Sequence, residues 1–321
     1  MKFFKAHFYL AIFLAFLTPA LPKAEASFQF ICVPEQKNVC TISQGEAGAL
    51  IIISSEPLNS IQGEIFTGQI LFKKEDKKGR IWSALFGADM EQAQGKYLFK
   101  LKATTSGGEN INAYLTILVQ RKEFPSEYLA LPEKMVKFSP EVYKRVVKDN
   151  KTVLSVTSHF TPQIYWKGEF IRPVSGYITS PFGVRRIING EKRSAHTGVD
   201  LHAQEGEEIL ASNYGKVALV YEGYLLGKSI VIDHGSGLYT VYYHLSEIKI
   251  KQGEMVEKGK VIGLAGATGR ATAPHLHFGV KLNQARIDPM SLLNVSQILS
   301  ERIRWLKENE NLNSLLGTEK Y

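Results

Sequence analysis

The sequence predicts a mainly β protein built from two β-rich units with a helical connector between them. Runs of strand length, apolar or alternating, recur between residues 28 and 120 and again between residues 172 and 293. Polar and glycine-rich stretches separate these runs, as turns do. A segment between the two units and another at the end of the chain space their apolar residues at three and four positions, as helices do. A length of 321 residues is enough for two modest cores.

Residues 1–26 have the layout of a secretory signal peptide. Two lysines precede an apolar run over residues 8–21, and Ala24-Glu25-Ala26 offers a cleavage site of small residues. The run is short for a bilayer span, so we expect cleavage; an uncleaved leader is the alternative and would associate the protein with the membrane. Export places the protein in the periplasm, in the cell envelope or outside the cell.

Export also gives meaning to the two cysteines, Cys32 and Cys40. An exported pair eight positions apart predicts a disulfide that closes a short loop, and the spacing does not fit a C-x₂-C metal site. The leader carries three lysines and one glutamate, so its removal lowers the net charge from +8 to about +6. This basic charge suits work near an anionic surface. No nucleic-acid motif accompanies it, and we expect no nucleic-acid partner.

Residues 27–120 are predicted to form a β-sandwich of immunoglobulin-like size. Its strands are ALIIISS, GEIFTGQILF, RIWSALF, GKYLFKLKA and NAYLTILVQ, with turns such as KKEDKKG and TSGGEN between them. The unit contains no histidine and no acidic cluster with ligand spacing. We therefore expect it to bind, position or occlude rather than to catalyse.

The remaining chain divides into a connector, a second β unit and a C-terminal helix. The connector, residues 121–170, contains one predicted helix, which begins at Ser139-Pro140-Glu141 with serine as N-cap and proline in the first turn. The second β unit, residues 171–294, has glycine turns in EGYLLGKS, DHGSGL, KQGEMVEKGK and GATGRATAP. Residues 295–321 form the predicted C-terminal helix, whose Trp305 is expected to pack back on the body together with its apolar neighbours.

Six of the eight histidines lie between positions 196 and 277. His196 and Asp200 stand four apart in HTGVDLH, but Gly198 and Val199 disfavour a helix, and the glutamate of an H-E-x-x-H site is missing. A strand or extended turn is therefore predicted here. One histidine and one aspartate are a legitimate part of a zinc site.

A second pair, His275 and His277, falls in APHLHFGV, which reads as a buried strand. Residues two apart on a strand point the same way, roughly 6.6 Å apart. The spacing suits one histidine bound to a metal and the other beside it, without saying which; an exposed polar face is the alternative. His244 ends another predicted strand, where a partly buried histidine is the plain alternative to a role in a site.

Two other histidines have plainer interpretations. His234 is expected to lie in a turn between two strands, and His202 is expected at the surface or behind a metal ligand.

A shell of two histidines and one aspartate with an open fourth position would hold a zinc-bound water. Further histidines would supply acid–base catalysis and steady an oxyanion. The chain thus contains the parts of a zinc hydrolase, although spacing alone does not assign them.

Four segments together carry a resemblance to a known family: SPFGVRR from 180, HTGVDL from 196, YYHLS from 242 and GATGRATAPHLHFGV from 266. They resemble the lysostaphin-type (LytM-like) zinc metalloendopeptidases, which cut the peptide part of bacterial peptidoglycan. The resemblance covers about 125 residues, from 171 to 294. It departs from the family in Ala273, where glycine is common, and in His202, where a small or apolar residue is common.

The resemblance implies a role for each candidate residue. His196, Asp200 and His277 would bind one Zn²⁺ per chain, and His275 and His244 would act in catalysis. The implied fold is a mostly antiparallel β-sheet metallopeptidase domain with a groove over the metal, preceded by the β-sandwich and the helical connector. The implied partners are stem peptides and cross-bridges of peptidoglycan. A non-catalytic peptidoglycan-binding activator of other hydrolases, and a zinc protease that acts on proteins, are the alternatives.

Overall fold

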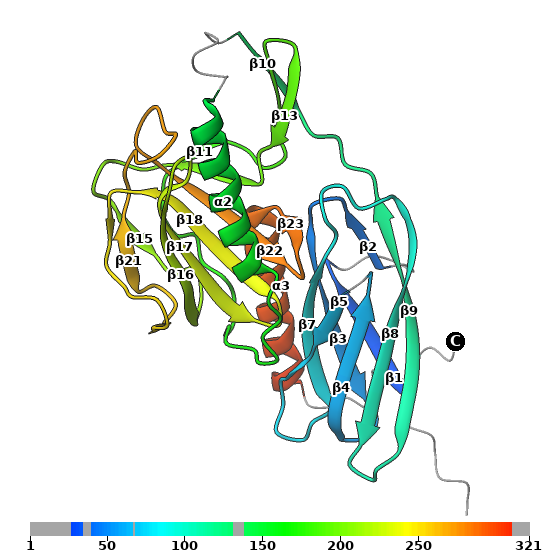
Figure 1. Cartoon of the computed structure of the whole chain (residues 1–321). Coiled ribbons are helices and arrows are strands. Elements are labelled where there is room, and N and C mark those ends of the chain that lie inside the picture. Colours follow the sequence, from blue (N-terminus) through cyan, green and yellow to red (C-terminus); the bar gives the residue numbers. More distant parts are fainter. Residues whose placement is uncertain (1–26, 35–39, 67, 131–137, 310–321) are drawn as a thin grey trace, which may run out of the picture.

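The structure, a computed structural model, describes residues 27–34, 40–66, 68–130 and 138–309 (Figure 1). The predicted signal peptide lies outside these ranges and stays a prediction. The described chain is mainly β, as predicted, and its strands form two large bodies with two helices. None of the helices in the described ranges is both long enough and apolar enough to cross a membrane.

The N-terminal body is a sandwich of two sheets. One sheet has the order β1-β3-β7-β6, with strands Phe28–Val33, Ala47–Ser54, Ile81–Gly87 and Lys73–Lys74. The other has the order β2-β9-β8-β4-β5, with strands Cys40–Ser43, Asn110–Gln120, Gly95–Thr105, Leu58–Ile65 and Gly68–Leu71. The predicted disulfide joins Cys32 to Cys40 and so links the two sheets. The likeness to an immunoglobulin domain stays a prediction.

Strand β3 is buried on both faces, which explains its unbroken apolar run. Leu50 and Ile52 face the core between the two sheets, whereas Ile51 and Ile53 belong to a larger core that continues into the second body. This division follows from the two-residue period of a strand. The C-terminal helix α3 (Pro289–Glu308) packs on β3 and lies between the two bodies (Figure 1).

The helix α3 begins earlier than residue 295, where the sequence placed it. The side chain of Asp288 caps it by accepting the N–H of Met290 at 3.0 Å, and Pro289 occupies its first turn. The expected packing of Trp305 is wrong, because this side chain is 43% exposed and Arg302 lies over its ring. The expected packing of its apolar neighbours is confirmed, because Ile303 and Leu306 are buried and hold the last turns on the body.

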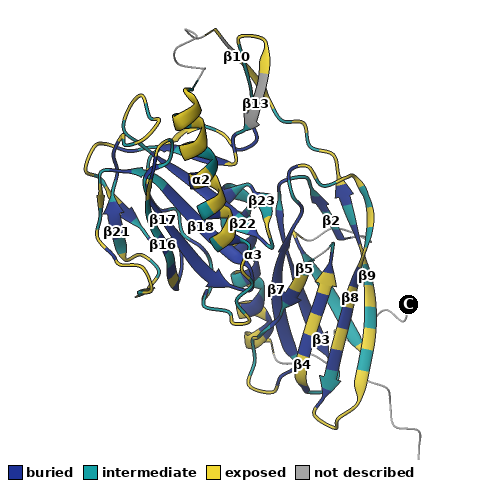
Figure 2. Cartoon of the chain, in the orientation of Figure 1, coloured by how far each residue is buried: buried dark blue, intermediate teal, exposed yellow. Residues whose placement is uncertain are grey.

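The second body is built on an eight-stranded antiparallel sheet. Its order is β11-β14-β22-β18-β17-β16-β20, with β23 paired to β22, and the strands are Ile178–Ser180, Gly198–His202, His275–Leu282, Leu238–Leu245, Gly227–Gly235, Gly215–Gly223, Met255–Val256 and Ala285–Ile287. The middle strands of this sheet are buried (Figure 2). The antiparallel sheet is the one that the family resemblance implied.

Two smaller sheets flank it. One has the order β15-β21-β19, with strands Glu208–Leu210, Val261–Leu264 and Glu247–Ile248. The other has the order β10-β12-β13, with strands Ser126–Leu129, Arg185–Ile188 and Glu191–Ala195. The segment between the bodies thus supplies a strand, β10, besides its predicted helix. A four-residue strand is too short for its period to show in the sequence.

The predicted connector helix is confirmed as α2 (Pro140–Thr157), and Ser139 caps it by accepting the N–H of Val142 at 3.3 Å. It contacts β16 and turns its outer side to solvent (Figure 2). Asp149, which is buried on its inner side, accepts hydrogen bonds from the hydroxyl of Tyr221 and the N–H of Tyr224, both at 2.7 Å. The helix therefore anchors the hairpin between β16 and β17.

The expectation of a turn at His234 is wrong. This residue lies in β17 and is fully buried, with its Nδ1 2.7 Å from the carbonyl oxygen of Tyr214 and its Nε2 2.7 Å from the hydroxyl of Thr240. The turn lies just after it, at Ser236 and Gly237, between the end of β17 and the start of β18. Burial lowers the pKa of His234 to about 4 from its ordinary value of 6.5, so the ring is neutral near pH 7.

We expect acid to destabilise the protein through His234. Between pH 6.5 and about 4 the unfolded chain binds a proton at this residue and the folded chain does not, so the free energy of unfolding falls by up to about 3 kcal/mol. Urea unfolding of the wild type and His234→Asn at pH 7 and pH 4.5 measures the difference. The variant should lose less stability on acidification; an equal loss in both proteins would contradict the assignment.

Candidate active site

The candidate residues meet at one end of the eight-stranded sheet, where β14, β22 and β18 run side by side. The register pairs Asp200 with His277 and pairs His277 with Tyr243. Directly opposed residues of antiparallel strands point to the same face. Both predicted strands are confirmed: the one expected in HTGVDLH is GVDLH, over residues 198–202, and the other begins with HLHFGV at residue 275.

Three side chains converge most closely: His196, Asp200 and His277. His196 Nε2 lies 3.0 Å from Asp200 Oδ1 and 3.0 Å from His277 Nδ1, and His277 Nδ1 lies 2.9 Å from Asp200 Oδ1. His196 Nδ1 lies 2.8 Å from the carbonyl oxygen of Pro181, to which it donates. That hydrogen bond leaves the lone pair of Nε2 directed at the other two residues.

This triangle of atoms fits a zinc ion. Ligand atoms that each lie about 2.0–2.2 Å from a tetrahedral zinc ion are separated by roughly 3.3 Å, and two nitrogens and one carboxylate oxygen are a common donor set for zinc. Burial alone would raise the pKa of Asp200, but the hydrogen bonds and charges of His196 and His277 outweigh burial and hold this pKa far below its ordinary value. Burial also lowers the pKa of His277, which favours its neutral, ligating form.

Two neighbouring residues, Gly198 and Tyr243, shape the position of His277. A Cβ atom at Gly198 would lie 2.7 Å from His277 Nε2, so the glycine of HTGVD makes room for the imidazole. On the other side, the ring of Tyr243 stacks on His277 at 5.2 Å and 6°. Tyr243 was not among the predicted site residues. The sequence does not show that this strand lies next to the strand of His277, so it gave no sign of the stacking.

The remaining two histidines, His275 and His244, lie next to this triangle. Their ring centroids are 4.8 Å apart, and His275 Nε2 lies 3.8 Å from Asp200 Oδ1. The Nδ1 atoms lie 2.9 Å from the carbonyl oxygens of Ala273 and Thr268, respectively, and donate to them. Each ring therefore keeps Nε2 free of a proton, in the form that accepts one.

The backbone also holds His244 in place. Its φ angle is +68°, in the left-handed region, and its N–H donates to the carbonyl oxygen of Leu226 at 3.0 Å. Leu226 belongs to the hairpin that Asp149 of α2 anchors. Burial lowers the pKa of His244 to about 4, so the imidazole is neutral near pH 7.

His202 does not belong to the triangle of candidate metal ligands. It is partly exposed, and its ring stacks on Tyr177 at 4.9 Å and 13°. His234, as described above, is buried away from the site.

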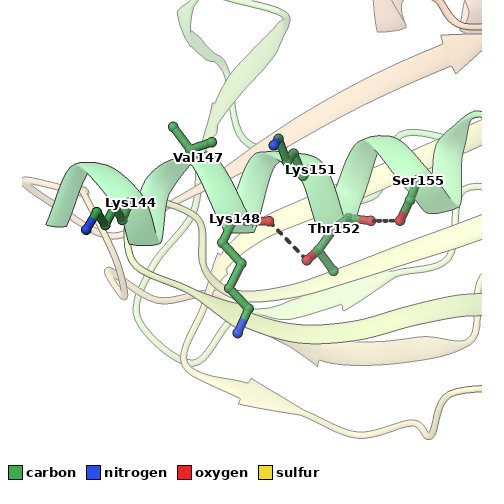
Figure 3. Close-up of a pocket in the computed structure, with 6 residues that line it drawn as sticks. All are labelled: Lys144, Val147, Lys148, Lys151, Thr152 and Ser155. Atoms are coloured by element: carbon green, nitrogen blue, oxygen red, sulfur yellow. Dashed lines mark hydrogen bonds between the residues drawn. The ribbon is translucent and has the colours of Figure 1, made fainter. Parts of the chain in front are cut away.

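A hollow of about 550 Å³ lies elsewhere, along the exposed side of α2 (Figure 3). It is lined by residues of this helix alone, Lys144, Val147, Lys148, Lys151, Thr152 and Ser155, and contains no candidate site residue.

Comparison with known proteins identifies the region that carries the site. Residues 194–289, which include all five converging residues, match the model of peptidase family M23. A solved peptidase M23 structure from Pseudomonas aeruginosa is 28% identical, with a TM-score of 0.60, over 79% of this chain and 95% of that one.

Two curated bacterial proteins are also similar over this region. "Peptidoglycan DD-endopeptidase ShyB" of Vibrio cholerae is 41% identical over 114 residues, 35% of this chain and 27% of that protein. "DD-carboxypeptidase/endopeptidase Mpg" of Neisseria meningitidis is 37% identical over 115 residues, 36% of this chain and 26% of that protein. The chain thus spans about a quarter of the length of these curated relatives. The family expected from the four motifs is confirmed: the chain carries a peptidase domain of family M23.

Proposed function

We propose that this protein is a zinc-dependent endopeptidase that hydrolyses peptide cross-links of bacterial peptidoglycan. The observation that carries the proposal is the convergence of His196, Asp200 and His277 beside two further imidazoles, within the M23 domain. The first three residues would hold one Zn²⁺. The peptidoglycan-cleaving activities in the names of the similar proteins support the choice of substrate.

A bound zinc ion would supply Lewis-acid chemistry, lowering the pKa of a water molecule and polarising the carbonyl of the peptide bond. The chain's own residues would then move the protons. Nε2 of His275 or His244 accepts the proton of the attacking water, and the ring that becomes charged can donate to the oxyanion or to the leaving amine. Hydrolysis then balances, because water supplies the hydroxyl of the new carboxyl group and the proton of the new amine.

The position of Asp200 supports His275 as the base. Its carboxylate oxygen lies 3.8 Å from His275 Nε2, close enough to stabilise a positive imidazolium. The neutral state of His244 near pH 7 suits orientation of the water through its free Nε2. The chain has all five residues expected for metal binding and catalysis. This argues against the alternative of a non-catalytic peptidoglycan-binding activator.

We infer that the protein is exported and acts in the cell envelope. The disulfide between Cys32 and Cys40 supports an oxidising compartment, and the signal-peptide layout of residues 1–26 agrees with it. We also propose the sandwich at 27–120 and the connector at 121–170 as modules that precede the peptidase domain at 171–294, with 295–321 as the C-terminal helical segment.

Incubation of the purified mature protein with peptidoglycan sacculi tests the proposed function. We expect soluble peptidoglycan fragments with one new amine and one new carboxyl group per cut, and none after treatment with a chelator. A library of unrelated peptides serves as the comparison substrate and should be cut much more slowly. Undiminished release after chelation, or faster cleavage of the library, would contradict the proposal.

A further inference from the structure

The floor of the candidate site continues beyond His275 onto the next strand. The register pairs His202 of β14 directly with His275 of β22, two residues from the Asp200–His277 pair. All four side chains therefore lie on the same face of the sheet. With His244 on the far side of His275, the imidazoles of His244, His275 and His202 follow one another across three adjacent strands.

Tyr177 extends this row at its outer end. Its ring stacks on that of His202 at 4.9 Å and 13°, and its carbonyl oxygen accepts the N–H of His202 at 2.9 Å. The Tyr177 side chain is nevertheless 67% exposed. Within the described parts of the chain, neither ring nitrogen of His202 nor the hydroxyl of Tyr177 has a hydrogen-bond partner. The pair offers an aromatic face and free polar atoms to solvent.

The backbone holds this pair rigidly. A Cβ atom at Gly176 would overlap the carbonyl oxygen of His202, at 1.6 Å, so only glycine allows the two segments to approach so closely. The guanidinium of Arg172 donates to the carbonyl oxygen of Gly176. Within the described ranges Arg172 has no acidic partner, and its Nε is buried without a hydrogen-bond partner. A guanidinium without a described acidic partner therefore contacts the backbone at Gly176, next to Tyr177.

We propose that Tyr177 and His202 form a subsite for a free carboxylate of the substrate peptide, within about three residues of the cleaved bond. Strands lie about 4.8 Å apart and an extended peptide advances about 3.3 Å per residue, so a peptide crossing the strands reaches the pair one to three residues from His275. The positive charge of Arg172 and the unpaired donors favour a carboxylate over a neutral amide. The inference deepens the proposed function and rests on it.

Steady-state kinetics with the full mature, zinc-loaded chain test the subsite. The substrates are two synthetic cross-linked peptides that differ only in having a free carboxylate or a carboxamide next to the cleavage site. We expect the wild type to prefer the carboxylate about tenfold through KM. His202→Ala and Tyr177→Ala should each lose most of this preference, with kcat within about twofold. Tyr114→Ala, on the exposed side of β9, is the matched control and should keep the preference.

Calorimetric binding of both uncleaved peptides, the carboxylate and the carboxamide, is measured in a His275→Ala background with and without His202→Ala and separates the two claims. If His202→Ala loses the carboxylate preference in binding, the subsite is supported. This holds even if the wild type cleaves neither peptide; that result would overturn only the proposed function. A wild type that cleaves, with KM and preference unchanged in His202→Ala and Tyr177→Ala, overturns the subsite. A fall in kcat with unchanged KM also overturns it.

Discussion

Replacement of His277 by alanine is expected to abolish metal binding and, with it, peptide hydrolysis. His277 Nδ1 is one corner of the triangle with His196 and Asp200, and two remaining ligands do not make a tight zinc site. We expect less than about a tenth of an equivalent of zinc after dialysis and activity at least about a thousandfold below the wild type. Mass-spectrometric metal analysis and the release of soluble peptidoglycan fragments measure the two effects.

Replacement of His277 could also disturb folding, because this residue is buried against Tyr243, so a control for folding is needed. His277→Gln keeps most of the volume and should lose the metal as well, with a circular dichroism spectrum like that of the metal-free wild type. His159→Ala, at an exposed histidine after α2, should keep one zinc per chain. One equivalent of tightly bound zinc in His277→Ala would contradict the ligand assignment.

His275→Ala is expected to behave differently, keeping the metal and losing turnover. Its Nε2 lies 3.8 Å from Asp200 but outside the triangle, and its Nδ1 donates to the backbone at Ala273. Loss of a positioned general base costs about 10²–10⁴-fold in kcat. Substrate affinity should change little, so we expect KM within a few-fold of the wild type.

Metal content and kcat of His275→Ala must be measured on the same preparation. If zinc and activity disappear together, the roles of the two histidines in the H-x-H pair are exchanged. If kcat stays within tenfold of the wild type, His244 alone serves as the base. Either result would overturn the division of roles between neighbouring histidines on one strand.

The parts of the site that depend on strand periodicity were predictable from sequence. The two-residue period placed His275 and His277 on one face, and Gly198 and Val199 correctly excluded a helix at Asp200. Which strands become neighbours is set by long-range pairing, which periodicity does not encode. The family resemblance, rather than spacing, predicted that His244 lies beside the other site residues. The catalytic role of His244 and the roles of the other four residues stay predictions.

The two wrong expectations, for His234 and Trp305, both concern burial in the tertiary structure. DHGSG contains turn residues, yet His234 is buried, with hydrogen bonds to Tyr214, just before β16, and to Thr240 of β18. Trp305 falls on an apolar helical spacing, yet the body is covered by Ile303 and Leu306. In each case the local pattern was compatible with two environments, and contacts distant in sequence decided between them.

The proposed activity depends on a metal held by His196, Asp200 and His277. Titration of the metal-free mature protein with zinc, with cross-link cleavage followed at each step, tests this claim. We predict no cleavage without metal and a linear rise that ends at one zinc per chain. Cleavage by the metal-free protein, or none at full zinc occupancy, would contradict the claim.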